Sequence, residues 1–189
     1  QQYKREMLQM RQKAAGGGAL NQRYAFNINE AAQQAGTDLL NIANQPKNSV
    51  LGSFADMTGL GGDSMTKALR NTFTRTITKD DRRTFQQLVS GFENNMARAL
   101  GGGYANSSAK ASLEAYKQQV AREGDSPLAM AIFLARAKQE LSILNQAYKG
   151  HPGANEYEVN QMQDMINQLN KAIPFNVKDV QAASGRGSC

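Results

Sequence analysis

The sequence predicts an all-α protein, and three observations support this prediction. Apolar residues recur at spacings of three and four along most of the chain, and no alternation with a period of two extends beyond four residues. Glycine triplets, prolines and capping residues delimit the periodic stretches. Amides are abundant, with 18 Gln and 16 Asn among 189 residues, whereas only 40% of the chain is hydrophobic. We therefore expect a moderate helical core with wide polar faces.

The first 60 residues contain weaker helical patterns that glycine and proline interrupt. A Met- and Gln-rich helix is expected over residues 1–15, because the three glycines at 16–18 end it. A second helix over about 30–44 is expected to stop before Pro46, since the residue before a proline avoids helical geometry. One further helical turn is expected around 50–57. The apolar stripe of the second helix is narrow and consists of Ala31, Ala35, Leu39 and Ile42.

Capping signals become clearer between residues 63 and 100. Asp63 or Ser64 is expected to cap a short helix. Thr78 is expected to cap the next helix, which has the clearest signals, with Asp80 and Asp81 in its first turn, where the helix dipole favours anions. This helix ends at a second glycine triplet. Its apolar stripe covers four turns and consists of Phe85, Leu88, Phe92, Met96 and Leu100.

The C-terminal part of the chain predicts two further long helices. Ser126 and Pro127 open the first, because proline is tolerated at the first helical position, and it is expected to run to about 149. Asn155 and Glu158 are expected to form a capping box that opens the second. Weaker patterns predict two shorter helices, over residues 107–123 and, after the cap Asn176, over 177–183.

The distribution of these signals predicts how the chain is divided. Short connections place neighbouring helices antiparallel, so we expect an elongated or three-helix-bundle core over about 78–174. The whole bundle is expected to span 63–183. Residues 1–60 are expected to form a glycine-interrupted helical extension that packs on a partner or a neighbouring subunit. Residues 184–189, rich in Gly and Ser, are expected to be a flexible tail.

Few residues in the chain could support catalysis or bind a metal. His151, the only histidine, lies in an interhelical turn, where we expect it to face solvent. Zinc sites need three or four ligands and a catalytic triad needs a nucleophile, a base and an orienting group, so His151 and the terminal Cys189 supply neither. We predict a protein that is not an enzyme and has no cofactor or metal site. No apolar run approaches the roughly 20 residues that span a bilayer.

A basic stretch is the strongest candidate for a ligand-binding site. The chain has a net charge of +6 and a pI of about 9.5, which permits binding to phosphate polymers such as DNA. Phe73 and Phe85 lie within or beside the stretch, but both fall on apolar helical stripes and are expected to pack in the core. The candidate phosphate contacts are Lys67, Arg70, Arg75, Lys79, Arg82 and Arg83.

A second set of candidates could contact another protein chain. Methionine is an adaptable residue that is common where helices pack into partner surfaces, and two methionines lie on the N-terminal helix before the first glycine triplet. The helix over 30–44 has an equally isolated stripe. The predicted intermolecular contacts are therefore Tyr3, Met7, Met10, Leu39 and Ile42.

Two segments resemble parts of large bacteriophage virion proteins. The segments are LRNTFTRTITKDDRRTFQQL, which begins at Leu69, and AIPFNVKDV, which begins at Ala172. They are similar to internal or DNA-ejection proteins, which are long, helical and rich in Gln and Ala. The resemblance covers about a third of the chain and includes no functional motif. It implies a structural role in the particle and in passage of the genome through the host envelope.

These observations favour a non-enzymatic structural or interaction segment of a larger assembly. The predicted partners are further copies of the chain, in a homo-oligomer formed through its helices, and other virion proteins. The predicted location is the virion, or otherwise the cytoplasm. The alternative function is a nucleic-acid-binding helical module that contacts DNA through the basic stretch.

Overall fold

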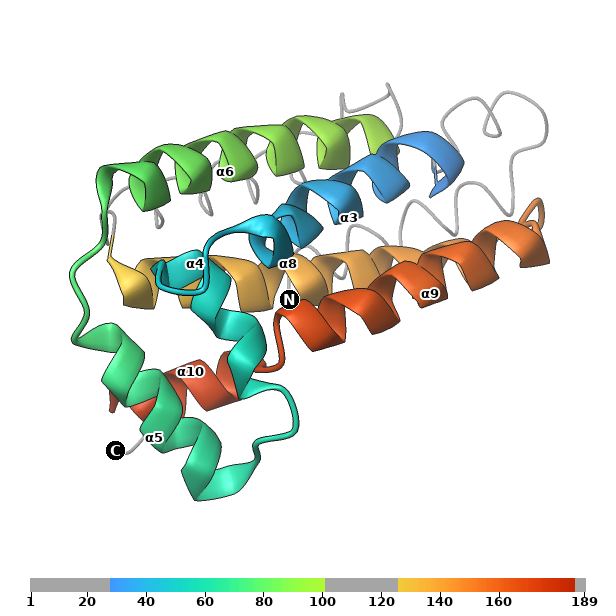
Figure 1. The fold of residues 1–189 in the computed structure, drawn as a ribbon. Coiled ribbons are helices and arrows are strands. Elements are labelled where there is room, and N and C mark those ends of the chain that lie inside the picture. Colours follow the sequence, from blue (N-terminus) through green and yellow to red (C-terminus); the bar gives the residue numbers. More distant parts are fainter. Residues whose placement is uncertain (1–27, 101–125, 186–189) are drawn as a thin grey trace.

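The computed structural model describes residues 28–100 and 126–185. Within these ranges the chain forms helices and turns and no strand, so the predicted all-α class is confirmed (Figure 1). The predicted helices over 1–15 and 107–123 lie outside the described residues. The described elements are η1 (Ile28–Ala32), α3 (Gln33–Leu40), η2 (Asn41–Asn44), α4 (Val50–Ser53), η3 (Phe54–Met57), α5 (Gly62–Phe73), α6 (Lys79–Ala99), α8 (Pro127–Lys149), α9 (Glu156–Ala172) and α10 (Val177–Ser184).

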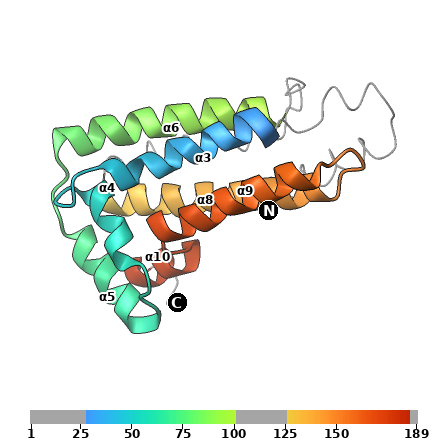
Figure 2. The ribbon, with the colours of Figure 1, turned by 45° about the vertical axis from the view of Figure 1, so that its right-hand side comes forward.

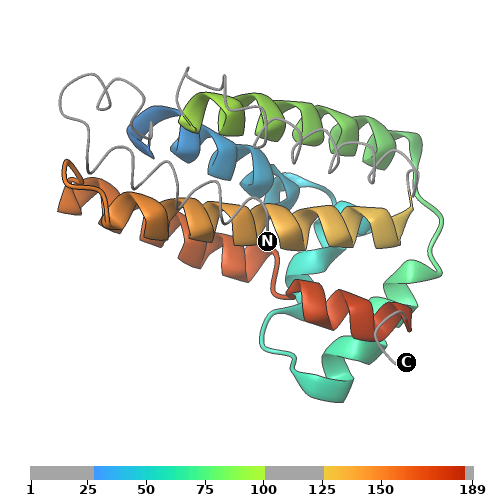
Figure 3. The ribbon, with the colours of Figure 1, turned by 180° about the vertical axis from the view of Figure 1, so that it is seen from behind.

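Four helices run alongside one another and form the body of the described fold. Helix α3 packs between α6 and α9, and α9 packs on α8 (Figure 1). Helices α5 and α10 pack against each other at one end of this body, where α10 also contacts α8 (Figures 1 and 2). From the opposite side, α8 runs along the whole body above α10 (Figure 3). The bundle therefore includes α3 in addition to the three helices predicted for 78–174.

Aromatic rings hold α6 against α8. Phe85 and Phe92 of α6 both meet Phe133 of α8 edge to face, with ring centroids 5.6 and 5.7 Å apart. All three rings are fully buried. A second pair, Phe54 and Phe175, has centroids 5.1 Å apart and joins η3 to the turn before α10. Aromatic pairs at such distances stabilise a core beyond the area that they bury.

Helix α3 is held by small residues instead. A Cβ at Gly36 would lie only 2.6 Å from Cγ of Met165 on α9, so the two helices approach where Gly36 has no side chain. On its other side, Asp38 lies over Gly91 of α6, where an added Cβ would lie 3.1 Å from Oδ2 of Asp38. Asn95 Nδ2 donates to Asp38 Oδ2 at 2.7 Å. The helix is thus an integral part of the bundle.

The prediction that residues 1–60 form a separate extension is therefore wrong for residues 28–60. The apolar residues of this range lie in the same core as those of α6, α8 and α9. The stripe is narrow because it begins with Ala31 and Ala35, and such small buried side chains let neighbouring helices pack closely. Residues 1–27 lie outside the described part of the chain.

Most predicted helix starts are confirmed. Thr78 and Asp81 form a capping box at α6, and Ser126 accepts a hydrogen bond from the Ala129 backbone N–H ahead of α8. Asn176 caps α10 and forms a box with Asp179. These caps satisfy backbone N–H groups that have no partner within the helix.

Three predictions about helix boundaries are wrong, two at the start of a helix and one at its end. Helix α5 begins after Gly61, which gives no side-chain cap, so neither Asp63 nor Ser64 caps it. Asn155 caps α9 by accepting from the Tyr157 N–H, but Glu158 does not complete a box. The predicted tail starts one residue too early, because Ser184 is the last residue of α10 and Gly185 follows it in the left-handed conformation.

Candidate functional site

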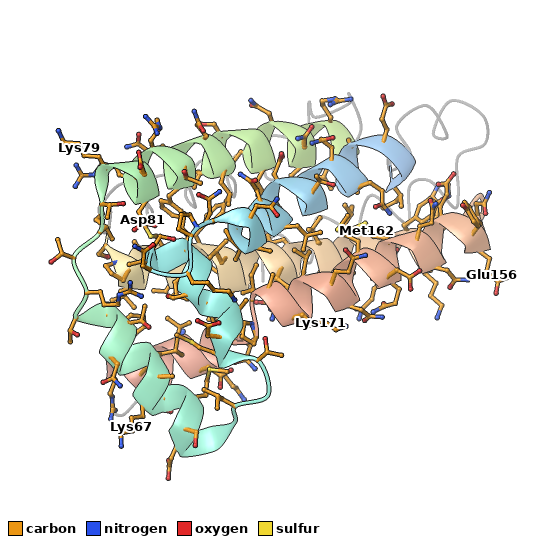
Figure 4. The ribbon with its side chains drawn as sticks, in the orientation of Figure 1. Lys67, Lys79, Asp81, Glu156, Met162 and Lys171 are labelled. Atoms are coloured by element: carbon orange, nitrogen blue, oxygen red, sulfur yellow. The ribbon has the colours of Figure 1, made fainter. Side chains whose placement is uncertain are left out.

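The structure divides the basic stretch among three elements. Lys67 and Arg70 lie on α5, Arg75 lies in the connection after it, and the others lie in the first turns of α6. Figure 4 shows Lys67 on α5, low on the left of the view, and Lys79 above it on the same side, at the start of α6. The six side chains therefore come from two helices and the connection between them.

Two of the arginines bind backbone carbonyls of their own chain. Arg70 donates from Nε to the carbonyl of Ala183 at 3.2 Å and from Nη2 to that of Ala182 at 3.4 Å, so it caps the end of α10. Arg75 donates from Nη2 to the carbonyl of Asn48, in the loop before α4. Because these guanidinium groups already donate to backbone carbonyls, fewer of their N–H groups remain available to bind a phosphate.

The remaining members lie on the exposed surface. Lys67, Lys79, Arg82 and Arg83 are exposed. Arg83 Nη2 lies 2.8 Å from Asp80 Oδ1, an exposed ion pair that reduces the positive charge of the first turn of α6. The cluster at this turn is therefore smaller than the sequence predicts.

Asp81 has a tertiary role that its position in a first helical turn did not reveal. Its carboxylate accepts from the backbone N–H of Val50 at 3.2 Å and of Leu51 at 3.3 Å, as well as from Thr78. One buried carboxylate therefore caps the start of α6 and the start of α4 together. No local sequence signal identifies these partners, because they lie about 30 residues away.

Two of the predicted intermolecular contacts are wrong. Leu39 and Ile42 are at most 1% exposed and belong to the core of this chain. They cannot contact another chain without unfolding their own. Tyr3, Met7 and Met10 lie outside the described residues.

A pocket of about 450 Å³ lies beside the turn that joins α9 to α10. Lys138 of α8 reaches into it and donates from Nζ to the carbonyls of Ile173 at 2.7 Å and Phe175 at 3.0 Å. Burial lowers the pKa of Lys138 to about 8, and the negative charge of Asp179 acts in the opposite direction. The pocket is lined by Lys138, Gln139, Ser142, Ile166, Asn170, Pro174, Phe175 and Asn176.

The two carbonyl bonds of Lys138 describe a structural role. Backbone carbonyls at a helix end need donors, and a lysine in this position supplies two of them. It thereby fixes the turn that directs α10 back onto α8. Among the described residues, Asp179 is the acidic group whose charge acts on this ammonium group.

The turn between α8 and α9 is built around Tyr148. Its hydroxyl donates to Glu158 Oε2 at 2.9 Å and accepts from the Asn155 N–H at 3.0 Å. The carboxylate of Glu158, which was predicted to complete a capping box, thus accepts from the Tyr148 hydroxyl instead. Burial is the main cause that raises the pKa of Tyr148.

His151 lies in the same turn, and the prediction that it faces solvent is wrong. The side chain is buried, its ring stacks on Tyr148 with centroids 6.4 Å apart, and Nδ1 accepts from the Gly153 N–H at 3.0 Å. Nδ1 is therefore unprotonated in the neutral ring. The residue shapes the turn.

The outer face of α9 is an exposed polar surface that extends from the first turn of the helix to the last. Its exposed side chains are predominantly amides, with an acidic residue at the first position and a basic residue near the last. In Figure 4, Glu156 and Lys171 point away from the bundle at the two ends of the helix, whereas Met162 points into it. The exposed outer residues include Glu156, Asn160, Gln163, Asn167 and Lys171.

Two further kinds of feature are absent from the described ranges. Residues 28–100 and 126–185 contain no cluster of three or more His, Cys, Asp or Glu side chains that could hold a metal ion. Across the same ranges, no helix combines the length and the apolar character that a membrane crossing requires.

Comparison with known proteins gives no match for this chain among family models, curated proteins or solved structures.

Proposed function

We propose that the chain is a non-enzymatic structural segment of a larger assembly, which associates with further copies of itself and with other proteins through polar helix faces. The resemblance of two segments to phage internal proteins supports a virion or genome-ejection component as the assembly. The observation that carries the proposal is the amide-rich outer face of α9, which lies over a closed apolar core.

The composition of the exposed surface supports this choice of interface. Within the described ranges, Leu60 and Tyr157 are the large hydrophobic residues that are exposed. Most of the side chains available for an association through these ranges are therefore polar. Gln and Asn suit this role, because each amide group both donates and accepts hydrogen bonds.

Sedimentation velocity over a range of protein concentrations tests the proposal. We expect the sedimentation coefficient to rise with protein concentration, because a weak self-association populates the oligomer only at high concentration. A chain that stays a compact monomer up to about 1 mM, and that also binds no other virion protein, would contradict the proposal.

DNA binding through the basic stretch is less well supported, because two of its six members bind backbone carbonyls. Three exposed members in the first turns of α6 could still contact phosphates. Fluorescence anisotropy with labelled duplex DNA at several salt concentrations separates the two functions. DNA binding predicts an affinity that falls steeply with salt and falls again in Arg82→Ala/Arg83→Ala. A flat salt response would favour the structural proposal.

A further inference from the structure

Five exposed residues form one stripe along α9, here named the outer stripe. Their spacings of four, three, four and four residues bring them to the same side of a helix with 3.6 residues per turn. The opposite side of α9 is buried against α3 and α8, through residues such as Met162 and Leu169. The outer stripe consists of Glu156, Asn160, Gln163, Asn167 and Lys171.

The outer stripe is polar throughout and has a charge at each end, and the exposed Asp164 lies beside its middle. Glu156 and Lys171 are separated by about 22 Å along the helix axis, from the rise of 1.5 Å per residue. Neither side chain has a hydrogen bond or ion pair within the described part of the chain. Between them, Gln163 donates from Nε2 to Asn167 Oδ1 at 3.1 Å. This bond leaves Gln163 Oε1 able to accept and Asn167 Nδ2 able to donate.

This arrangement is complementary to itself when it is reversed. In an antiparallel pair whose axis passes between Gln163 and Asp164, Glu156 faces Lys171 of the partner subunit. In the same register, Asn160 faces Asn167 of the partner subunit. Both contacts occur twice, as a two-fold interface requires. A parallel pair would instead place like charges together at both ends, which is unfavourable.

We propose that two copies of the chain pair through the outer stripes of their α9 helices, antiparallel and in this register. The inference rests on the proposed function and names the surface that performs it. The contact buries little apolar area, so a single pair is weak, and several such contacts in an assembly would reinforce one another. The partner that the stripe fits is therefore a second copy of this chain.

Charge reversal followed by mixing tests both the surface and the direction of pairing. In Glu156→Lys the ends of the pair are all lysine, and in Lys171→Glu they are all glutamate, so each variant should self-associate several-fold more weakly than the wild type. An equimolar mixture of the two variants restores an opposite charge at both ends. We expect the mixture to associate as strongly as the wild type, measured by sedimentation velocity at low salt.

Control variants make the same charge changes elsewhere. Asp63→Lys changes an exposed acid in the first turn of α5, and Lys178→Glu changes an exposed base on α10. Neither should alter self-association, and mixing them should have no effect. Circular dichroism establishes that each variant is folded. Glu156→Gln and Lys171→Gln serve if a charge reversal unfolds the chain, and each should weaken association by a smaller factor.

A cysteine-pairing experiment tests the register directly. In a Cys189→Ser background, Asn160→Cys and Asn167→Cys copies should form mixed disulfide dimers in preference to dimers of either variant alone. Wild-type self-association that none of these changes affects would overturn the pairing of α9 while the proposed function stands. A wild-type chain that does not self-associate at all would overturn the pairing, and binding to another virion protein would then be the remaining support for the proposed function.

Discussion

Helix α6 contacts its neighbours in two different ways. Towards α8 it presents Phe85 and Phe92, whose rings enclose Phe133. Towards α3 it presents Gly91 and Asn95, which meet Asp38. The first contact depends on buried aromatic area, and the second depends on close approach and one charged hydrogen bond. Large apolar residues at helical spacing are visible in a sequence, whereas a contact made of small residues resembles an unpacked surface.

The aromatic side of α6 should give the largest effect on stability. Replacing Phe133 by Ala removes a fully buried ring that contacts two others, and the free energy of unfolding should fall by about 3–5 kcal/mol. Urea denaturation followed by circular dichroism measures the change. Tyr157→Ala is the control, because that ring is 68% exposed and its removal should change stability by less than about 0.5 kcal/mol. Equal effects of the two variants would contradict the described core.

The polar connections of the N-terminal segment should give the next largest effect. Asp81→Ala leaves the buried N–H groups of Val50 and Leu51 without an acceptor and removes the capping box of α6, so we expect a loss of about 2–4 kcal/mol. The neighbouring Asp80→Ala should cost at most about 0.5 kcal/mol, because its ion pair with Arg83 is exposed. Chemical denaturation of both variants gives the difference. Similar losses at the two positions would show that Asp81 contributes no more than an exposed acid in the first turn of α6.

Close packing of α3 should produce a smaller effect that a second substitution reverses. Gly36→Leu places a side chain where Met165 already lies, and overpacking of this kind costs about 1–3 kcal/mol. Met165→Ala alone should cost less than it does in a fully buried site, because Met165 is only partly buried. In the double variant the new side chain occupies the space that Met165 leaves, so the two losses should not add. Additive losses in a double-mutant cycle would place Gly36 away from α9.

The comparison also explains which features could be predicted from the sequence. Thr78, Ser126 and Asn176 were identified as caps because their partners lie within three residues. The apolar stripe of α6 was identified because its residues are large. Gly36 carries no such signal, since its contact depends on which helix lies beside it.

The candidate site shows the same division between local and distant information. The basic stretch could be read from the sequence, but the carbonyl that Arg70 Nε binds lies 113 residues away and could not. Likewise, Asp81 was correctly placed in a first helical turn, while its bonds to Val50 and Leu51 required the fold. The amide-rich faces were predicted as a property of the composition, and only the structure identifies the outer side of α9 as one of them.

The contribution of Lys138 to stability is seen only when pH is varied. Its pKa is lowered to about 8 in the folded chain, from 10.5 in an unperturbed lysine, because burial disfavours the charged form. Between these two pH values the unfolded chain binds more protons than the folded chain at this residue. The free energy of unfolding contributed by Lys138 should therefore rise with pH over this interval, with a slope below about 1.4 kcal/mol per pH unit.

Other groups titrate in the same interval, so a matched variant is needed. The pKa of Tyr148 is raised by burial, which means that the unfolded chain loses this proton first and that stability falls above about pH 10. Lys138→Arg retains donors for the carbonyls of Ile173 and Phe175 but keeps its charge at every pH tested. Denaturation curves from pH 7 to 10.5 should therefore show the wild type gaining stability relative to Lys138→Arg as pH rises. Parallel pH profiles would mean that the ammonium group is as well solvated in the folded chain as in the unfolded one, and that it does not hold the turn between α9 and α10 from a buried position.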